Sequence, residues 1–255
     1  MKNTLLSFAI GLSAGLFGGL IGVGGGIIMI PLMVHILKLS QHQAHGTSLM
    51  ALVFTGLGGA LIYGLHGQIS YLAAGLLALT AIPTARAGAR YANALSGWKL
   101  RKIFGGFLIA CALILAAKPY LPAGGGPHPV YVNILVFAAA GLATGFLSGL
   151  MGVGGGMIMI PAMVLFAGFG QHVAQGTALA VMIPVGLTGA FAHSQMGNVV
   201  KRHLPGLLCG IFLGSILGGN LANLIPDMPL RTTFIIATAF LGIRYLRTRA
   251  AAAGA

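Results

Sequence analysis

Two glycine runs are the residues whose type and spacing best suit a binding site. The run GVGGG occurs at 22–26 and again at 152–156, and a proline follows the last glycine by five residues in each copy, Pro31 or Pro161. Consecutive glycines let the backbone leave a helical path at little steric cost. Because proline is tolerated in the first turn of a helix, each run predicts a short helix or half helix that starts at the break.

A helix that starts inside a membrane directs free N–H groups and the positive end of its dipole at whatever lies beside it. In lipid, such irregular backbone persists only where protein or a water-filled cavity covers it. An anion is the ligand that this arrangement suits. The binding residues predicted on this basis are Gly24, Gly25 and Gly26 in the first run and Gly154, Gly155 and Gly156 in the second.

The same glycines also suit close packing of helices. Under this alternative the runs line no site, and small residues let neighbouring helices approach each other. The presence of the run and its proline in both copies favours the binding interpretation. Two rows with four-residue spacing support the packing alternative: Gly11, Gly15 and Gly19, and Gly18, Gly22 and Gly26.

A polar cluster follows each break, at 41–48 and at 171–177. Hydroxyl and amide donors suit the oxygens of sulfite, sulfonate or carboxylate, and we expect them to face the glycine break across a cavity. The alternative for the two threonines is a helix N-cap, in which the hydroxyl accepts a free N–H. The predicted binding residues of the cluster are Thr47, Ser48, Gln175 and Thr177.

Histidines are a weaker set of candidates. His42 and His172 occupy equivalent places near loops, where a surface role is one interpretation and a ligand role another. His193 stands where the first copy has Tyr63, and it suits either a substrate or proton role or a hydrogen bond to the backbone. The eight histidines do not cluster at ligand spacing with acids or cysteines, so no metal site and no cofactor is predicted.

Charged residues are few and almost all basic. Arg86 and Arg90 share a helix face, where they either reach the membrane surface or form a vestibule that attracts anions. Asp227 is the one acid in the chain, and it lies in a proline-flanked loop. Carriers coupled to protons or sodium usually use intramembrane acids. Coupling here would therefore use histidine or the protonation of the substrate, or transport would be uncoupled.

Composition excludes several classes of protein. Of 255 residues 57% are hydrophobic and 6% are charged, with a net charge of +13 and a mean hydropathy of +0.97. A soluble domain carries about 25% charged residues. The basic residues fall in short clusters between apolar runs, which predicts membrane lipid and a small anionic substrate as partners and no nucleic acid; both a monomer and a homo-oligomer are compatible with this pattern. No acid–base pair, nucleophile or metal cluster indicates an enzyme, so no catalytic residue is predicted.

The chain repeats itself without gaps at a separation of 130 residues, so that Gly22 matches Gly152. The predicted domains are a first transmembrane repeat at 1–118, an inter-repeat loop at 119–130 and a second transmembrane repeat at 131–255. Each repeat holds five apolar stretches. An N-terminal signal peptide is excluded because its segment recurs in the second repeat. The sequence predicts an all-α integral membrane protein with about 8–10 transmembrane or half-spanning helices.

Orientation follows from the basic residues. If the first two stretches of each repeat form a hairpin, nearly all lysines and arginines lie on one face of the membrane. The positive-inside rule then places both termini in the cytoplasm. Each repeat has an odd number of net crossings in this arrangement, so we expect two inverted-topology repeats, a common transporter design.

The doubled motif resembles the TauE/SafE sulfite exporter family. The pattern is G-x-G-G-G, a proline five residues later, and then A-x-G-T-S; the second copy has Ala178 in place of the final serine. The resemblance implies a multi-pass permease of the bacterial inner membrane that exports small anions such as sulfite or organosulfur and sulfonate anions. The alternatives are a metal-ion or other small-solute permease that uses histidine, and an accessory membrane subunit.

Overall fold

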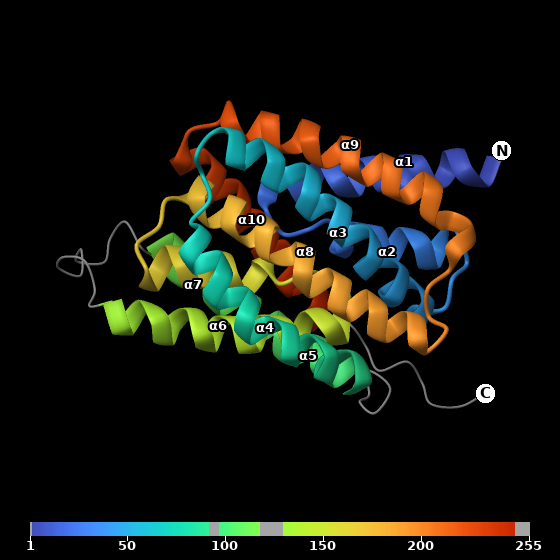
Figure 1. The fold of residues 1–255 in the computed structure, drawn as a ribbon, viewed down its shortest axis with the longest axis horizontal. Helices are drawn as coiled ribbons and strands as arrows, with labels where there is room; N and C mark the ends of the chain where they lie inside the picture. The colour runs from blue at the N-terminus through green and yellow to red at the C-terminus, as the bar shows by residue number, and fades with distance from the viewer. Residues whose placement is uncertain (1, 92–96, 118–129, 248–255) are drawn as a thin grey trace.

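The structure is a helical bundle. The computed structural model describes residues 2–91, 97–117 and 130–247, and these form ten α-helices and one short 3-10 helix without strands (Figure 1). The predicted all-α class is thereby confirmed. The elements are α1 (Lys2–Ile21), α2 (Gly26–His35), α3 (Gln41–Leu65), α4 (Tyr71–Tyr91), α5 (Gly97–Ala117), α6 (Val130–Met151), α7 (Gly156–Phe166), α8 (Gln171–Gln195), η2 (Lys201–His203), α9 (Leu204–Asn223) and α10 (Asp227–Leu246).

Six of these helices are long and apolar enough to cross a bilayer. A hydrocarbon core of about 30 Å needs about 20 helical residues. Large apolar side chains on their outer faces, such as Leu135, Leu187 and Phe191, are exposed, as lipid contact requires. The chain is therefore a multi-pass membrane protein. The candidate spans are Thr4–Ile21, His42–Leu65, Tyr71–Tyr91, Val132–Met151, Gln171–Gln195 and Lys201–Asn223.

The helices that follow the glycine runs are short. α2 has 10 residues and α7 has 11 residues. At 1.5 Å per residue each reaches only about half of the hydrocarbon core. Pro31 and Pro161 lie inside these helices, and most residues of α7 and half of those of α2 are buried. The predicted half helices are thus confirmed, and protein covers most of α7 and the first turn of α2.

Glycine rows hold the outer helices together. Helix α1 packs along α9, and a Cβ atom added to Gly11, Gly15 or Gly19 would overlap the α9 backbone. Since lipid provides no hydrophobic drive for association, close backbone contact supplies the attraction. The packing alternative is confirmed for this row. The equivalent row on α6 packs in the same way against α4, through Gly141, Gly145 and Gly149.

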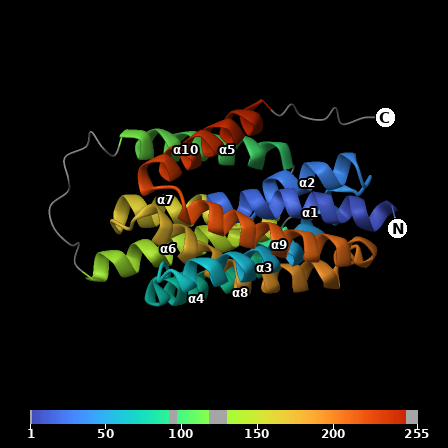
Figure 2. The ribbon, with the colours of Figure 1, turned by 90° about the horizontal axis from the view of Figure 1, so that it is seen from above.

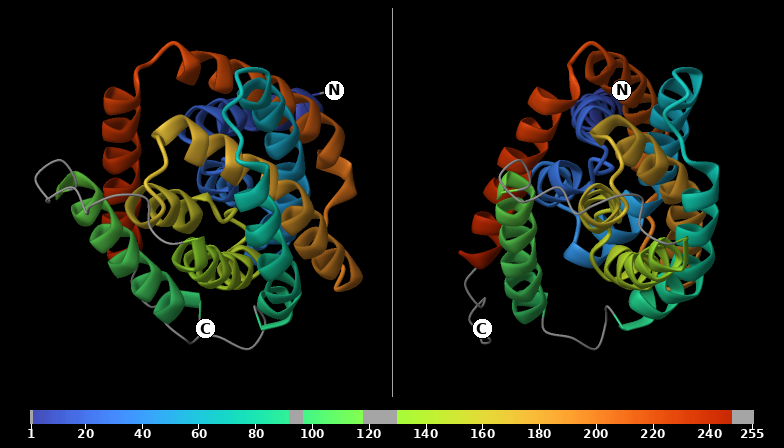
Figure 3. Two further views of the ribbon diagram at one scale, coloured as in Figure 1. Left: turned by 60° about the vertical axis from the view of Figure 1, so that its left-hand side comes forward. Right: turned by 90° about the vertical axis from the view of Figure 1, so that its left-hand side faces the viewer.

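The remaining helices form a core and a separate pair. The long helices α3 and α8 pack against each other, with α9 on α3 and α4 on α8. Helices α5 and α10 pack mainly against each other and lie to one side of the other helices (Figure 2). Seen more nearly end on, α2 and α7 lie inside the ring of longer helices (Figure 3). The two half helices are therefore enclosed between the core and the α5–α10 pair.

The repeat is visible in which helices pair. Each helix of the first repeat has its equivalent five helices later in the second repeat. Exchanging every helix for its equivalent turns the α1–α9 pair into the α6–α4 pair, and it leaves the α3–α8 and α5–α10 pairs unchanged. The domain boundaries and the inverted topology of the two repeats stay predictions. The predicted inter-repeat loop at 119–130 lies almost entirely outside the described residues.

The long helices start at the first residue of each polar cluster. Helix α3 begins at Gln41 with Ser40 as N-cap, and the Ser40 hydroxyl accepts the Gln43 N–H at 3.2 Å while the Ser40 N–H donates to Gln43 Oε1 at 3.1 Å. This reciprocal capping box satisfies two N–H groups at the helix start. The N-cap of α8 is Gly170. The N-cap interpretation of Thr47 and Thr177 is therefore wrong, because both lie one to two turns inside their helices.

Candidate functional site

The glycine runs form two sharp backbone breaks. Gly22, Gly24 and Gly25 have φ angles of 76°, 93° and 72°, and Gly152 and Gly154 have φ angles of 67° and 80°. These values lie in the left-handed region, which side chains other than glycine enter only at a cost. The break between α1 and α2, and that between α6 and α7, therefore require glycine at these positions.

The two breaks contact each other at the centre of the bundle. A Cβ atom added to Gly26 would lie 2.6 Å from the Gly152 carbonyl oxygen, and one added to Gly156 would overlap the Gly22 carbonyl oxygen. Neither α2 nor α7 has a side chain that caps its start. Two positive helix ends, both with uncapped N–H groups, thus begin at the point where the halves of the chain meet.

Hydroxyl groups from α3 brace the breaks by donating to their carbonyl oxygens. Ser48 Oγ donates to Gly152 O at 2.6 Å and to His45 O at 2.9 Å, and Thr55 Oγ1 donates to Gly24 O at 3.4 Å. Both side chains are fully buried. The predicted binding residue Ser48 therefore positions the second break, and its hydroxyl proton is already used there.

The predicted residues Thr47 and Thr177 hold loops in place. The Val200 N–H donates to Thr47 Oγ1 at 3.1 Å, and the Ser70 N–H donates to Thr177 Oγ1 at 3.0 Å. Each threonine thus anchors the loop that follows the long helix of the opposite half. Both side chains are fully buried.

Gln175 links α8 to the first break and to α3. Its Oε1 lies 2.7 Å from the Tyr63 hydroxyl, which also lies 3.2 Å from the Gly19 carbonyl oxygen. Its methylene groups pack against Gly22, and its buried Nε2 has no hydrogen-bond partner. A buried amide N–H without a partner costs about 1–3 kcal/mol. Of the predicted polar residues, Gln175 thus has an unused donor beside the break.

His193 makes the backbone bond that its position suggested. Its Nε2 lies 3.1 Å from the Gly149 carbonyl oxygen, in the place where Tyr63 bonds to Gly19 in the other half. The ring is fully buried. The simpler interpretation, a histidine hydrogen-bonded to backbone, is confirmed for His193.

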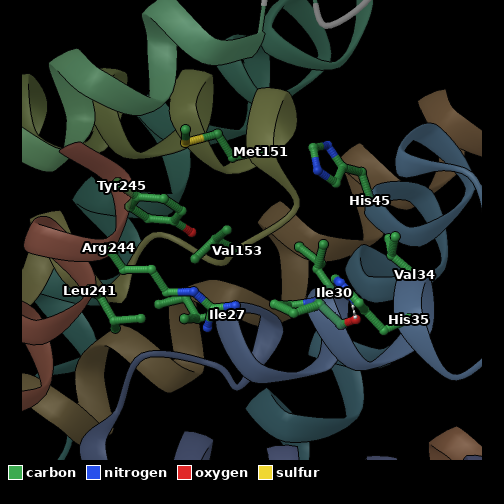
Figure 4. Close-up of a pocket in the computed structure, with 11 residues that line it drawn as sticks. Ile27, Ile30, Val34, His35, His45, Met151, Val153, Leu241, Arg244 and Tyr245 are labelled. Atoms are coloured by element: carbon green, nitrogen blue, oxygen red, sulfur yellow. Dashed lines mark hydrogen bonds between the residues drawn. The ribbon is translucent and has the colours of Figure 1, made fainter. Parts of the chain in front are cut away.

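Two adjoining cavities lie between the first break and α10. One of about 220 Å³ and one of about 450 Å³ share Ile27, Leu241 and Arg244 as lining residues. Gly25 lines the larger cavity, and His35 and His45 line the smaller. Figure 4 shows the Arg244 side chain extending from α10 into the space beside Ile27, with the His45 ring on the other side of that space.

The other predicted glycines are in contact with protein. A Cβ atom added to Gly24 would lie 2.9 Å from Leu52 Cδ2, and one added to Gly154 would lie 3.0 Å from the Val23 carbonyl oxygen. Gly155 packs against the Thr144 methyl group. Among the predicted binding residues, Gly25 alone lines the two cavities. The other glycines form the breaks, Ser48 and Gln175 contact them, and the two threonines hold loops. The binding role of all these residues stays a prediction.

Sequence reasoning missed α10 as a wall of these cavities. The positive-inside rule assigned Arg244 to the cytoplasmic face together with most other lysines and arginines, and gave it no further role. Thr238 and Arg244 lie six residues apart, and nothing in the linear pattern connects them to Gly25. Comparison of the two repeats offers one signal: Thr238 and Arg244 are polar, whereas the equivalent residues in α5, Leu108 and Ile114, are apolar.

Four titratable residues singled out in the sequence, His172, Asp227, Arg86 and Arg90, lie outside both cavities. His172 Nδ1 pairs with Asp227 Oδ1, and His172 Nε2 lies 3.0 Å from the Ala222 carbonyl oxygen. Arg86 and Arg90 are exposed and line neither cavity. Within the described part of the chain, no three His, Cys, Asp or Glu residues lie close enough to hold a metal ion.

Comparison with known proteins decides the family. The model of the family described as sulfite exporter TauE/SafE matches residues 7–245. The chain belongs to the TauE/SafE family. This confirms the resemblance seen in the doubled glycine motif, whose two copies are the two breaks at the centre of the bundle. No solved structure matches this family member.

Curated relatives of this TauE/SafE family member are named as membrane transporters. The probable membrane transporter protein YunE of Bacillus subtilis strain 168 is 30% identical over 231 residues, which cover 82% of this chain and 85% of the relative. A probable membrane transporter protein of Haemophilus influenzae is 27% identical over 253 residues, covering 91% and 94% of the two chains. The chain is thus a membrane permease rather than an enzyme.

Proposed function

We propose that this permease exports small anions, sulfite or organosulfur and sulfonate anions, across the bacterial inner membrane. The observation that carries the proposal is the meeting of two uncapped helix starts, α2 and α7, at the centre of the bundle beside a cavity. Free N–H groups and two dipole ends of the same sign favour negative charge there.

The distribution of charge supports an anionic substrate. The charged or titratable residues that line the two cavities are His35, His45, Arg244 and Tyr245, and no carboxylate is among them. The single acid of the chain, Asp227, pairs with His172 at the start of α10 instead. A cation in these cavities would meet positive ends without a counter-charge, which is unfavourable in a medium of low dielectric constant.

Export is the direction that the membrane potential favours. An inside-negative potential drives an anion outward by about 2.3 kcal/mol per charge per 100 mV. Uncoupled outward transport therefore requires no intramembrane acid. We further propose that both termini are cytoplasmic and that the two halves are inverted, because this arrangement places most basic residues on the cytoplasmic side.

The test is transport by the purified protein. Liposomes that contain the protein are loaded with sulfite, sulfate, thiosulfate or sulfoacetate, and efflux is followed with and without a pH gradient and an imposed potential. We expect efflux of at least one sulfur oxyanion, faster when the interior is negative. Absence of flux for every anion would refute the proposal. Flux of divalent metal ions without anion flux would favour the metal-ion alternative.

Variants connect the flux to the breaks. Gly25→Val should abolish efflux because the added side chain, at a residue with positive φ, overlaps the Ala14 carbonyl oxygen and so displaces the start of α2 beside the larger cavity. Gly75→Val is the matched control, since an added Cβ at Gly75 meets nothing within 4 Å. Folding is checked by gel filtration and helical circular dichroism. Unchanged efflux in a folded Gly25→Val protein would show that transport does not depend on the first glycine break.

A further inference from the structure

Arg244 is a basic residue of the second repeat that has no basic counterpart in the first repeat. It projects from α10 and lines both the smaller and the larger cavity, next to Ile27 in the first turn of α2 (Figure 4). The equivalent residue of the first half is Ile114, so the cation belongs to one half only. A guanidinium with five donors in a planar fork suits an oxyanion with two or three oxygens.

The surroundings of Arg244 divide by polarity. The smaller cavity adds the polar groups of His35, His45 and Tyr245 to the guanidinium. The larger cavity, of about 450 Å³, is lined mainly by hydrocarbon, including Phe17, Ile21, Val23, Ile28, Ile236 and Phe240. Arg244 therefore stands where a polar chamber meets an apolar one, and its exposed side chain is accessible to a solute.

Thr238 is a second polar group of the larger cavity. It lies on α10 among the lining residues and is fully buried, and its Oγ1 has no hydrogen-bond partner. Buried hydroxyl groups are nearly always hydrogen-bonded, and an exception needs an explanation such as a ligand. The equivalent residue of α5 is Leu108, so this hydroxyl, like Arg244, is confined to the second half.

Volume and wall chemistry select the kind of anion. Small-ligand sites are mostly apolar clefts of about 300–1,000 Å³ with a few polar groups that fix orientation. An inorganic oxyanion would leave the hydrocarbon walls of the larger cavity unused. An anion with a carbon body would fill them, and each methylene buried strengthens binding roughly fourfold.

We propose that Arg244 binds the oxyanion head of an organic anion whose apolar body occupies the cavity between α10 and the start of α2. This inference rests on the proposed function and specifies its substrate class: organic sulfonates with a carbon body rather than inorganic sulfite. Arg244 is the residue that selects charge, the apolar walls select the body, and the Thr238 hydroxyl donates to the substrate.

Binding to the purified full-length protein tests the inference. Isothermal titration calorimetry compares benzenesulfonate, methanesulfonate and sulfite, which present similar heads on bodies of decreasing size. We expect benzenesulfonate to bind at least about tenfold more tightly than methanesulfonate. Arg244→Gln should weaken benzenesulfonate binding about ten- to hundredfold, and Thr238→Val about two- to tenfold.

Matched variants on the same helix serve as controls. Arg247→Gln removes a neighbouring exposed arginine that lines neither cavity, and Thr232→Val removes a hydroxyl bonded to the Met228 carbonyl oxygen. Both should bind benzenesulfonate within about twofold of the wild type. If Arg244→Gln does not fold, Arg244→Lys replaces it: losing the fork of donors should weaken binding about threefold or more.

The outcomes separate the two proposals. Equal binding of benzenesulfonate and methanesulfonate, or unchanged binding in the Arg244 variants, overturns the inference. So does a phospholipid that native mass spectrometry finds in the cavity and that benzenesulfonate does not displace. Efflux of sulfite without binding of benzenesulfonate overturns the inference and leaves the anion-permease function intact. Tight benzenesulfonate binding without flux of any anion overturns the function and leaves the site.

Discussion

The two equivalent glycines Gly25 and Gly155 should respond differently to the same substitution. Each is the N-cap of a half helix, but Gly25 has a φ of 72° and Gly155 a φ of −87°. An added Cβ at Gly25 overlaps the carbonyl oxygen of Ala14, whereas one at Gly155 overlaps a side-chain methyl of Thr144. The first conflict involves backbone, and the second involves one movable group.

The magnitudes follow from these contacts. For Gly25→Ala, the left-handed conformation costs about 1–2 kcal/mol and the overlap with backbone a further 1–3 kcal/mol or so, a total of about 2–5 kcal/mol. For Gly155→Ala only the overlap applies, about 1–3 kcal/mol. Thr144→Ser removes the opposing methyl group at a cost of about 1 kcal/mol. Gly155→Ala combined with Thr144→Ser should therefore come within about 1 kcal/mol of the wild type.

The assay is unfolding by sodium dodecyl sulfate in mixed micelles, followed by circular dichroism. The two single variants and the double variant form a cycle that isolates the coupling between Gly155 and Thr144. We expect a favourable coupling of about 1–3 kcal/mol, equal to the overlap that the double variant relieves. Gly25→Ala has no corresponding rescue, because the obstructing atom belongs to the Ala14 backbone.

Two results would refute this reasoning. One is a Gly155→Ala and Thr144→Ser double variant as unstable as the sum of the single variants. The other is a Gly25→Ala variant as stable as the wild type, which would show that the break relaxes easily. The accessory-subunit alternative, in which the breaks have only a structural role, gives a different prediction. Under it, Gly24→Ala or Gly155→Ala would impair folding without changing ligand binding.

Other substitutions test the bracing and packing contacts. Ser48→Ala should lower the free energy of unfolding by about 1–3 kcal/mol, measured in the same micelles, because it removes a 2.6 Å bond to the Gly152 carbonyl. Tyr63→Phe should cost a similar amount, because Gln175 Oε1 loses its donor at 2.7 Å. Gly210→Ala should disrupt the α1–α9 pair and lower the yield of folded protein on gel filtration.

Controls for these substitutions lie on open surfaces. Gly75→Ala in α4 meets nothing within 4 Å and should be neutral, or stabilising by up to about 1 kcal/mol from helix propensity. A Gly210→Ala protein that is as stable as Gly75→Ala would contradict close packing of α1 on α9. Ser48→Ala or Tyr63→Phe without loss of stability would show that water replaces the lost bond.

Much of the fold follows from local features of the sequence. Apolar length predicts the spanning helices, and the glycine run followed by proline predicts the half helices α2 and α7. Both signals are local, since a span needs only enough apolar residues and a break needs only residues that adopt positive φ. Helix starts were less well predicted: α3 begins at Gln41 with a Ser40 capping box, so Thr47 is not the N-cap that one interpretation of the polar cluster made it.

The site was harder to predict, because polar residues near a break can serve either ligand or protein. Thr47 and Thr177 accept backbone N–H groups of distant loops, and Ser48 donates to a break in the other half. These partners lie more than 100 residues away in sequence. The pattern within one segment therefore cannot predict which of its hydroxyl groups form hydrogen bonds with distant parts of the chain.

The sequence by itself determined that the protein lies in lipid, that it consists of two repeats and that each repeat has a glycine break. Composition, self-similarity and backbone freedom are properties of the chain that do not depend on how its helices pack. Only the tertiary structure decided which residues of different helices contact each other. It brought the breaks at Gly22 and Gly152 into contact, and it placed Arg244 against the start of α2. Cavities form between surfaces of different helices, so their walls depend on packing that no single helix specifies.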